Sequence, residues 1–155
     1  MSAVSAIYKA PVVGKAVMSE AGEVSVIIQY HGRLYQGIAL LHPEDKEFFS
    51  EKVGYNIALS RARIEALEDT LIDVREEARI KEQMYYEATT FSNKSPEYSD
   101  PNMMFIGLVM RAKQRVETLQ EAIVREKKIL ANYLEGQDRA LESVKLYRKM
   151  QAETK

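Results

Sequence analysis

The sequence lacks most of the residue patterns that assign a protein to a chemical class. It contains no cysteine, which excludes disulfide bonds and thiolate metal sites and favours an intracellular protein. Only two histidines are present, and the seven glycines are scattered singly rather than grouped in a phosphate-binding loop. Neither a Gly-x-Ser-x-Gly nor a His-Glu-x-x-His motif occurs. We therefore expect no metal site, no cofactor and no catalytic residue.

Long apolar runs and a strong net charge are also missing. The N-terminus has no charged segment followed by an apolar core, as a signal peptide would. The uncharged stretch from Met103 to Met110 is far shorter than the roughly 20 residues that a membrane-spanning helix requires. The net charge is −1, whereas proteins that coat nucleic acid carry a local excess of lysine and arginine. We expect neither a membrane nor a nucleic-acid polymer as a partner.

The N-terminal quarter has the alternation of a small antiparallel sheet. Residues 12–18 form one candidate strand, and in residues 24–30 apolar side chains recur at every second position. His31-Gly32 suits a tight primed hairpin turn, because glycine tolerates a positive φ. Residues 33–41 return as the partner strand, in which Leu34, Ile38 and Leu40 share a face. The pattern predicts a three-stranded meander over residues 1–41.

The remainder has helical spacing with one interruption. His42-Pro43-Glu44-Asp45 is typical of a helix start, and a three-four apolar pattern follows to residue 90. A loop over residues 91–100 contains proline and three serines, and a second helix is predicted over residues 101–150. The fold class is therefore α+β: a meander followed by a long antiparallel helical hairpin. At 155 residues, the chain has the length of a single domain.

Both predicted helices carry apolar residues outside their main stripes. Because one partner helix covers only one face, these residues favour a homo-oligomer. Glu126 and Gln137 interrupt the stripe of the second helix, and polar residues at such positions tend to fix register or partner choice. The additional apolar positions are Ile72, Ile80, Met84, Leu108, Met110, Ile129, Leu134 and Leu146.

Basic residues are grouped at two places in the predicted hairpin. Arg61 and Arg63 lie in the first helix, and Arg111, Lys113 and Arg115 lie early in the second. One interpretation is a solvated helix face. The other is that arginines from neighbouring protomers converge on a phosphate, which planar guanidinium groups bind with paired hydrogen bonds.

Aromatic side chains gather beside amides and hydroxyls around the predicted loop. Tyr85 and Tyr86 precede the loop, Phe91 and Tyr98 lie in it and Phe105 follows it, with Asn93 and Asn102 nearby. A purine ring would be bound by such a set, through an aromatic face and amide groups for its edge. Alternatively, Phe91 and Tyr98 close the end of the hairpin and take no part in binding.

A short segment carries a resemblance to a known kind of protein. It consists of a strand ending in His42-Pro43-Glu44-Asp45, then Phe48-Phe49, Gly54 and the run Ile57-Ala58-Leu59-Ser60-Arg61-Ala62. This segment resembles a module of small bacteriophage proteins, among them the anti-Thoeris sponges that bind and sequester cyclic ADP-ribose isomers without cleaving them. The likeness covers residues 24–66 and is architectural beyond. Phage proteins of unknown role share the motif.

This resemblance implies a partner, a location and a site. The partner would be a cyclic ADP-ribose-type signal, bound between protomers in the cytoplasm of the infected bacterial host. Sponges of this type hold the base between an aromatic residue and an arginine, with an amide nearby. Those roles match Phe91, Asn93 or Asn102, and Arg111 or Arg115; Tyr98 completes the expected ligand-binding set. The alternative hypothesis is a structural or adaptor protein acting through coiled-coil-like oligomerisation.

Overall fold

A computed structural model describes the backbone of residues 2–94 and 102–154, and the side chains of residues 2–90 and 105–154. The chain divides into two compact units. The first comprises Met1–Ala66 and Val124–Lys155, and the second comprises Leu67–Ile123. Helices α2 (Glu51–Lys94) and α3 (Asn102–Glu153) contribute to both units.

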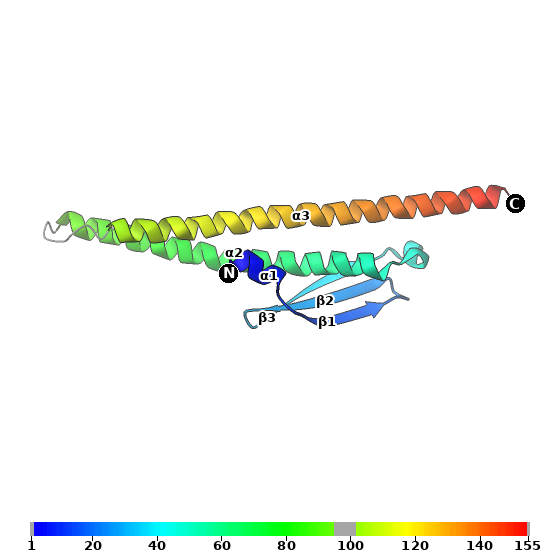
Figure 1. Ribbon diagram of the computed structural model, residues 1–155, viewed down its shortest axis with the longest axis horizontal. Coiled ribbons are helices and arrows are strands. Elements are labelled where there is room, and N and C mark those ends of the chain that lie inside the picture. The colour runs from blue at the N-terminus through cyan, green and yellow to red at the C-terminus, as the bar shows by residue number, and fades with distance from the viewer. Residues whose placement is uncertain (1, 95–101, 155) are drawn as a thin grey trace. The chain divides into compact units, whose positions relative to one another are not determined.

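The predicted meander is confirmed. Strands β1 (Val12–Met18), β2 (Glu23–Tyr30) and β3 (Arg33–Leu40) form one antiparallel sheet in the order β1-β2-β3 (Figure 1). Strands β2 and β3 pair without a register shift, from Glu23 opposite Leu40 to Tyr30 opposite Arg33. Their turn has positive φ at both His31 (50°) and Gly32 (72°), as a primed hairpin turn requires.

One face of the sheet packs on the first part of α2. Val24, Val26 and Ile28 of β2 are fully buried in this layer, together with Ile57 of α2. On β3 the buried positions are Tyr35, Gly37 and Ala39. Leu34, Ile38 and Leu40 share a face, as expected, but it is the outer one, and Leu40 is 67% exposed.

The N-terminal segment differs from the prediction of sheet structure over residues 1–41. Residues Ala3–Tyr8 form a short helix, α1, which Ser2 caps by accepting a hydrogen bond from the Ser5 backbone N–H at 3.1 Å. Ile7 anchors α1 and is only 1% exposed. Six residues are too few for a helical period to stand out in the sequence, and burial of Ile7 supplies the stability that propensity does not.

The helix boundaries also require correction. His42 caps a 3₁₀ helix, η1 (Pro43–Phe48), and α2 begins only at Glu51, so residues 42–90 are not one helix. Helix α2 continues to Lys94, into the predicted loop, and α3 runs from Asn102 to Glu153 rather than from 101 to 150. Gly136 does not interrupt α3. Helices α2 and α3 pack against each other, which confirms the α+β class with a helical hairpin.

The apolar stripe of α3 is covered over only part of its length. In the second unit, Val109, Ala112, Leu119 and Ile123 are buried, as are Leu67 and Leu71 of α2. Three residues that continue the stripe in the first unit are exposed: Tyr133 (40%), Val144 (38%) and Tyr147 (62%). The sequence pattern alone did not distinguish the covered part of the stripe from the open part.

Candidate functional site

The aromatic and amide residues expected to bind a ligand fall at the break between α2 and α3. Phe91 and Asn93 lie in the last turn of α2, and Asn102 is the first residue of α3. The side chains of these three residues, and the whole of Tyr98, lie outside the described part of the structure. Their convergence on a base therefore stays a prediction.

Arg111 and Arg115, the two arginines of the expected site, both lie on α3 in the second unit. The Arg111 Nε donates to the Gly107 carbonyl oxygen one turn earlier, at 3.3 Å. Within the described residues, no carboxylate is paired with Arg111. Arg115 donates to Glu77 of α2 at 3.3 Å, and both side chains are about half exposed (51% and 42%). The two arginines are four residues apart and so lie on neighbouring turns of one face.

Glu77 is shared between two cations. Lys81 donates to its carboxylate at 2.7 Å, and this hydrogen bond is the main reason that the pKa of Glu77 lies below its usual value. The coulombic effect of Arg115 lowers the pKa of Glu77 further. Because Lys81 neutralises the Glu77 carboxylate, the Arg115 side chain can move away from Glu77 without leaving that carboxylate unpaired.

Beside these residues the second unit has a shallow hollow of about 360 Å³. Arg79 is held there by two hydrogen bonds to Glu76, at 2.7 and 3.0 Å, and Lys113 pairs with Glu82 at 3.2 Å. The lining therefore mixes opposite charges that neutralise each other. Neither Arg111 nor Arg115 lines this hollow, whose lining consists of Arg75, Ala78, Arg79, Glu82, Lys113, Val116 and Glu117.

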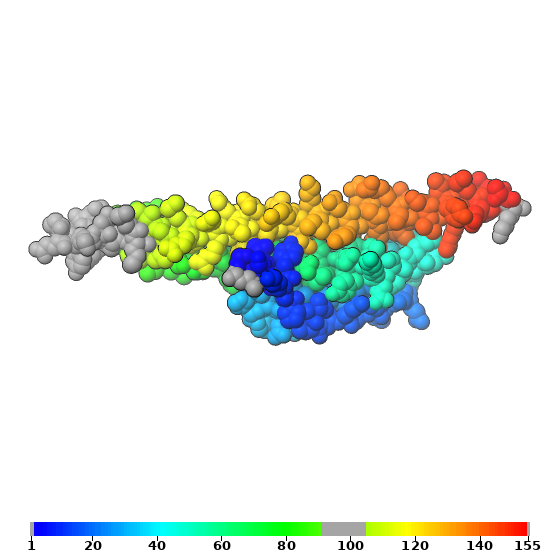
Figure 2. Space-filling model, in the orientation of Figure 1, coloured from blue at the N-terminus to red at the C-terminus, as the bar shows by residue number. Residues whose placement is uncertain are grey.

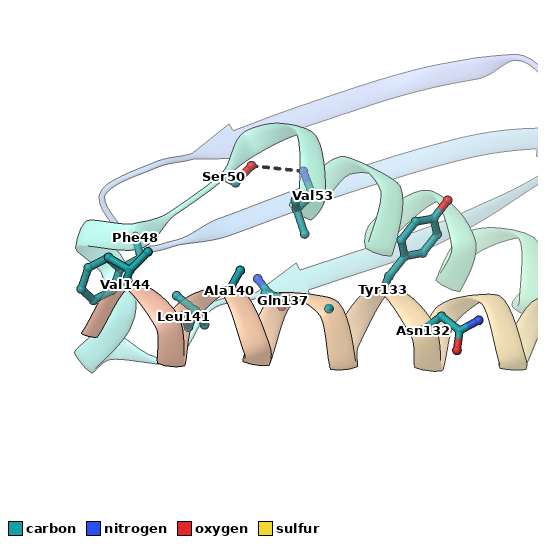
Figure 3. A pocket seen from close by; sticks show the side chains of 10 residues that line it. Phe48, Ser50, Val53, Asn132, Tyr133, Gln137, Ala140, Leu141 and Val144 are labelled. Atoms are coloured by element: carbon teal, nitrogen blue, oxygen red, sulfur yellow. Dashed lines mark hydrogen bonds between the residues drawn. The ribbon is translucent and has the colours of Figure 1, made fainter. Parts of the chain in front are cut away.

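The first unit contains a deeper cavity, of about 300 Å³, that sequence reasoning missed. It lies between α3, from Asn132 to Val144, and the segment of η1 and α2 that contains Phe48 and Val53 (Figure 3). The only sequence signal for it was the coincidence of Gly136 and Gln137 within an otherwise apolar stripe. The register role expected of Gln137 did not indicate a cavity.

A buried polar cluster lies elsewhere in the first unit. The Glu126 carboxylate, 2% exposed, accepts hydrogen bonds from Ser60 Oγ at 2.7 Å and from the Tyr8 hydroxyl. The α1 segment lies beside α3 in Figure 2. Arg63 lies over the Tyr8 ring, 4.9 Å from its centroid. Tyr8, Ser60 and Glu126 thus join α1, α2 and α3.

The residues that carry the phage-module resemblance build the joint between sheet and helix. A Cβ on Gly37 would lie 1.7 Å from the Ala58 carbonyl oxygen and 2.6 Å from the Ala62 nitrogen. A Cβ on Gly54 would lie 2.7 Å from Val24. Ala58 and Ala62 are fully buried. These small residues allow β3 and α2 to approach closely, so this part of the motif is explained by packing.

Two further residues, Arg61 and His42, have structural partners. Arg61 donates to the Ile38 carbonyl oxygen at 2.6 Å, which ties α2 to β3. His42 Nδ1 accepts from the Glu44 backbone N–H at 3.3 Å, in agreement with the expected role at a helix start.

Among the residues described, no cluster of metal-ligating side chains occurs. No helix in the described ranges is long and apolar enough to cross a membrane.

Comparison with known proteins adds no assignment. The chain matches no protein-family model, no curated protein and no solved structure. The site must therefore be judged from its own chemistry.

Proposed function

We propose that this protein is a sponge that binds and sequesters a cyclic ADP-ribose-type nucleotide in the cytoplasm of an infected bacterial host, without cleaving it. The observation that carries the proposal is the arginine pair on α3. Arg111 has no carboxylate partner in the described part of the chain, and Arg115 has one partly exposed partner that it shares with Lys81.

This arrangement suits a pyrophosphate because the ligand would replace only weak interactions. An exposed ion pair such as Arg115–Glu77 contributes about 0–1 kcal/mol, since water and salt screen it. A guanidinium group can bind a phosphate through two parallel hydrogen bonds. Exchange of Glu77 for phosphate is therefore favourable, and Lys81 remains to neutralise the carboxylate.

The base would be bound at the neighbouring break between the helices. In this proposal Phe91 or Tyr98 stacks on the purine, and Asn93 or Asn102 contacts its edge. Phe91 and Asn93 lie in the last turn of α2, and Asn102 begins α3 nine residues before Arg111. A second protomer completes the pocket, as the resemblance in residues 24–66 implies.

Calorimetric titration with cyclic ADP-ribose isomers tests the arginine role. Arg111→Gln removes the charge but keeps an amide, and we expect affinity to fall about tenfold to a hundredfold, as for a lost charged hydrogen bond. Arg139→Gln is the matched control, because Arg139 is also an exposed α3 arginine, paired with Glu135 in the first unit. Equal affinity in both variants would remove Arg111 from the site, and failure of every isomer to bind would overturn the proposal.

A heat-release experiment tests whether the ligand is left intact. The protein is saturated with ligand, separated from free nucleotide and denatured by heat. A sponge returns the same cyclic molecule, which chromatography and mass spectrometry identify. Recovery of a linear product would show cleavage and contradict sequestration.

Exposed apolar side chains on the helices favour the second candidate, a structural or adaptor protein. Ile72 is 64% exposed and Met110 is 66% exposed, although both lie in long helices. Large exposed apolar side chains on this scale mark contact surfaces when they are contiguous. In this case Ile72→Glu would abolish oligomer formation and function, while Arg111→Gln would leave function unchanged. Charges at Leu71 or Ile123 are less informative, because both are buried and their replacement would disrupt the unit itself.

A further inference from the structure

The cavity in the first unit is lined mainly by apolar groups. Val53 of α2 and Ala140, Leu141 and Val144 of α3 form most of its wall (Figure 3). An aromatic ring lies toward each end, Phe48 beside Val144 and Tyr133 farther along α3 (Figure 3). Its volume of about 300 Å³ is at the lower end of the range for small-molecule sites.

We propose that this cavity binds an uncharged, flat nitrogen heterocycle of about the size of a nucleoside. It is a site separate from the arginine pair, and it lies wholly within the first unit. The inference goes beyond the proposed sequestration of a cyclic nucleotide and does not require it.

Gly136 is the first reason for this assignment. It lies in the interior of α3, where glycine is unfavourable because it increases the conformational freedom of the unfolded chain. A Cβ at this position would meet no atom within 4 Å, so no contact within the described chain demands a glycine. Gly136 instead lines the cavity without a side chain. A planar ring could lie against it in van der Waals contact.

The aromatic residues give the second reason. Arg148 lies over the Phe48 ring, 4.7 Å from its centroid, and also pairs with Glu47 at 2.9 Å. These contacts hold Phe48 in place at its end of the cavity. Tyr133 projects from α3 toward α2 (Figure 3), and the residue is 40% exposed. A bound heterocycle would cover apolar surface on both rings.

The polar residues define the edge of the ligand. Gln137 lines the cavity and has no hydrogen-bond partner among the described residues, so its amide can both donate and accept. Ser50 Oγ accepts from the Val53 backbone N–H at 3.4 Å, which leaves its own proton available to donate. A ring that carries both donors and acceptors, such as a nucleobase, matches this pair.

The charges around the cavity exclude an ionic ligand. No lysine, arginine, aspartate or glutamate lines the cavity. The α3 cations that adjoin lining residues in the sequence are already paired, Arg139 with Glu135 and Lys145 with Asp45. A phosphate in the cavity would lose water without gaining an opposite charge, which is strongly unfavourable. The ligand is therefore neutral.

Adenosine is the probe for the test, used with the full-length protein in calorimetric titrations. Wild-type protein should bind it saturably, with a dissociation constant below about 1 mM. Gly136→Leu fills the cavity and should weaken binding more than about tenfold, a loss of about 1.4 kcal/mol. Its melting temperature should equal or exceed that of the wild type, because leucine is the better helix former. Ala131→Leu, on the opposite face of α3, is the matched control and should bind normally.

A second variant keeps the test decisive. Gln137→Leu retains the size of the side chain but removes the amide, and it should weaken adenosine binding while leaving the fold intact. Absence of saturable binding to the wild type, or equal affinity in Gly136→Leu, would overturn the inference. If adenosine does not bind and Gly136→Leu changes the mass of the oligomer, the cavity is a contact surface between protein chains. That result would also overturn the inference. Arg111→Gln should leave adenosine affinity unchanged, because Arg111 does not line this cavity. Loss of adenosine binding and loss of cyclic nucleotide binding can therefore be told apart.

Discussion

Ser60 of α2 donates a hydrogen bond of 2.7 Å to the carboxylate of Glu126 of α3, and both residues are 2% exposed. The Tyr8 hydroxyl of α1 donates to the same carboxylate. One buried acidic residue therefore fixes three helices of the first unit relative to one another. Any sliding of α3 along α2 would leave a buried carboxylate without a partner.

The first prediction concerns this cluster. Glu126→Ala should lower the free energy of unfolding by about 1–3 kcal/mol, because it leaves the buried Ser60 hydroxyl unsatisfied. Urea denaturation followed by circular dichroism measures the change. Glu121→Ala, at an exposed position of the same helix, is the control and should be near neutral. Equal stability of the two variants would show that the cluster does not contribute.

The second prediction is a loss of stability in alkaline solution. Burial of Tyr8, together with its hydrogen bond to Glu126, raises the pKa of its hydroxyl from 10.0 to about 12. The folded state therefore favours the protonated form. This contribution is fully present below pH 10 and is lost as the pH rises from 10 to about 12.

Tyr8→Phe isolates this effect. Its unfolding free energy should be lower than that of the wild type at neutral pH and should decline less steeply between pH 10 and 12, as measured by urea denaturation. Tyrosinate absorbance should show one late-titrating tyrosine that the variant lacks. An identical alkaline decline in both proteins would assign it to other groups, such as Tyr30, whose pKa burial also raises.

The third prediction separates two glycines by their surroundings. Gly37→Ala should destabilise the protein by about 3 kcal/mol or more, because the new methyl group would overlap the backbone of α2 at Ala58. Gly136→Ala meets open space and should stabilise it by up to about 1 kcal/mol through helix propensity. Thermal unfolding of both variants measures the contrast. Similar melting temperatures would contradict the close approach of β3 to α2.

The fourth prediction concerns the outer face of the sheet. Leu34 and Leu40 are 62% and 67% exposed and lie on this face, which has few charges. If the face contributes to the proposed homo-oligomer, Leu34→Thr with Leu40→Thr should weaken association in sedimentation equilibrium. The stability of the protomer should change by less than about 0.5 kcal/mol per position. Gln29→Thr, opposite Leu34, is the control, and unchanged association in the double variant would place the interface elsewhere.

Several elements could be predicted because their signals are local. The alternation in residues 24–30 and the His31-Gly32 turn predicted the hairpin, since both depend on neighbouring residues alone. The three-four spacing predicted the two long helices. The short α1 could not be predicted, because its stability depends on burial of Ile7 and on a contact 118 residues away between Tyr8 and Glu126.

The candidate sites were less predictable for the same reason. Arg111 and Arg115 were chosen from residue type and from the resemblance, but only the structure shows that, among the described residues, Arg115 has an acidic partner and Arg111 does not. The cavity around Gly136 depends on the distance between α3 and the start of α2. No pattern of neighbouring residues in the sequence predicts that distance. Its residues come from two segments, 48–53 and 132–144, that are far apart in the sequence.

The sequence by itself determined the order of the three strands and the two long helices, the hairpin turn and the α+β class, because backbone preferences and side-chain periodicity act over a few residues. The tertiary structure decided which of two apolar faces is covered. Either face of β3 could have formed the core. One face carries Leu34, Ile38 and Leu40, and the second carries Tyr35, Gly37 and Ala39. Only the second set allows α2 to approach, because Gly37 has no side chain to hold it away. The same long-range packing gave Glu126 its partners and left the wall at Gly136 open.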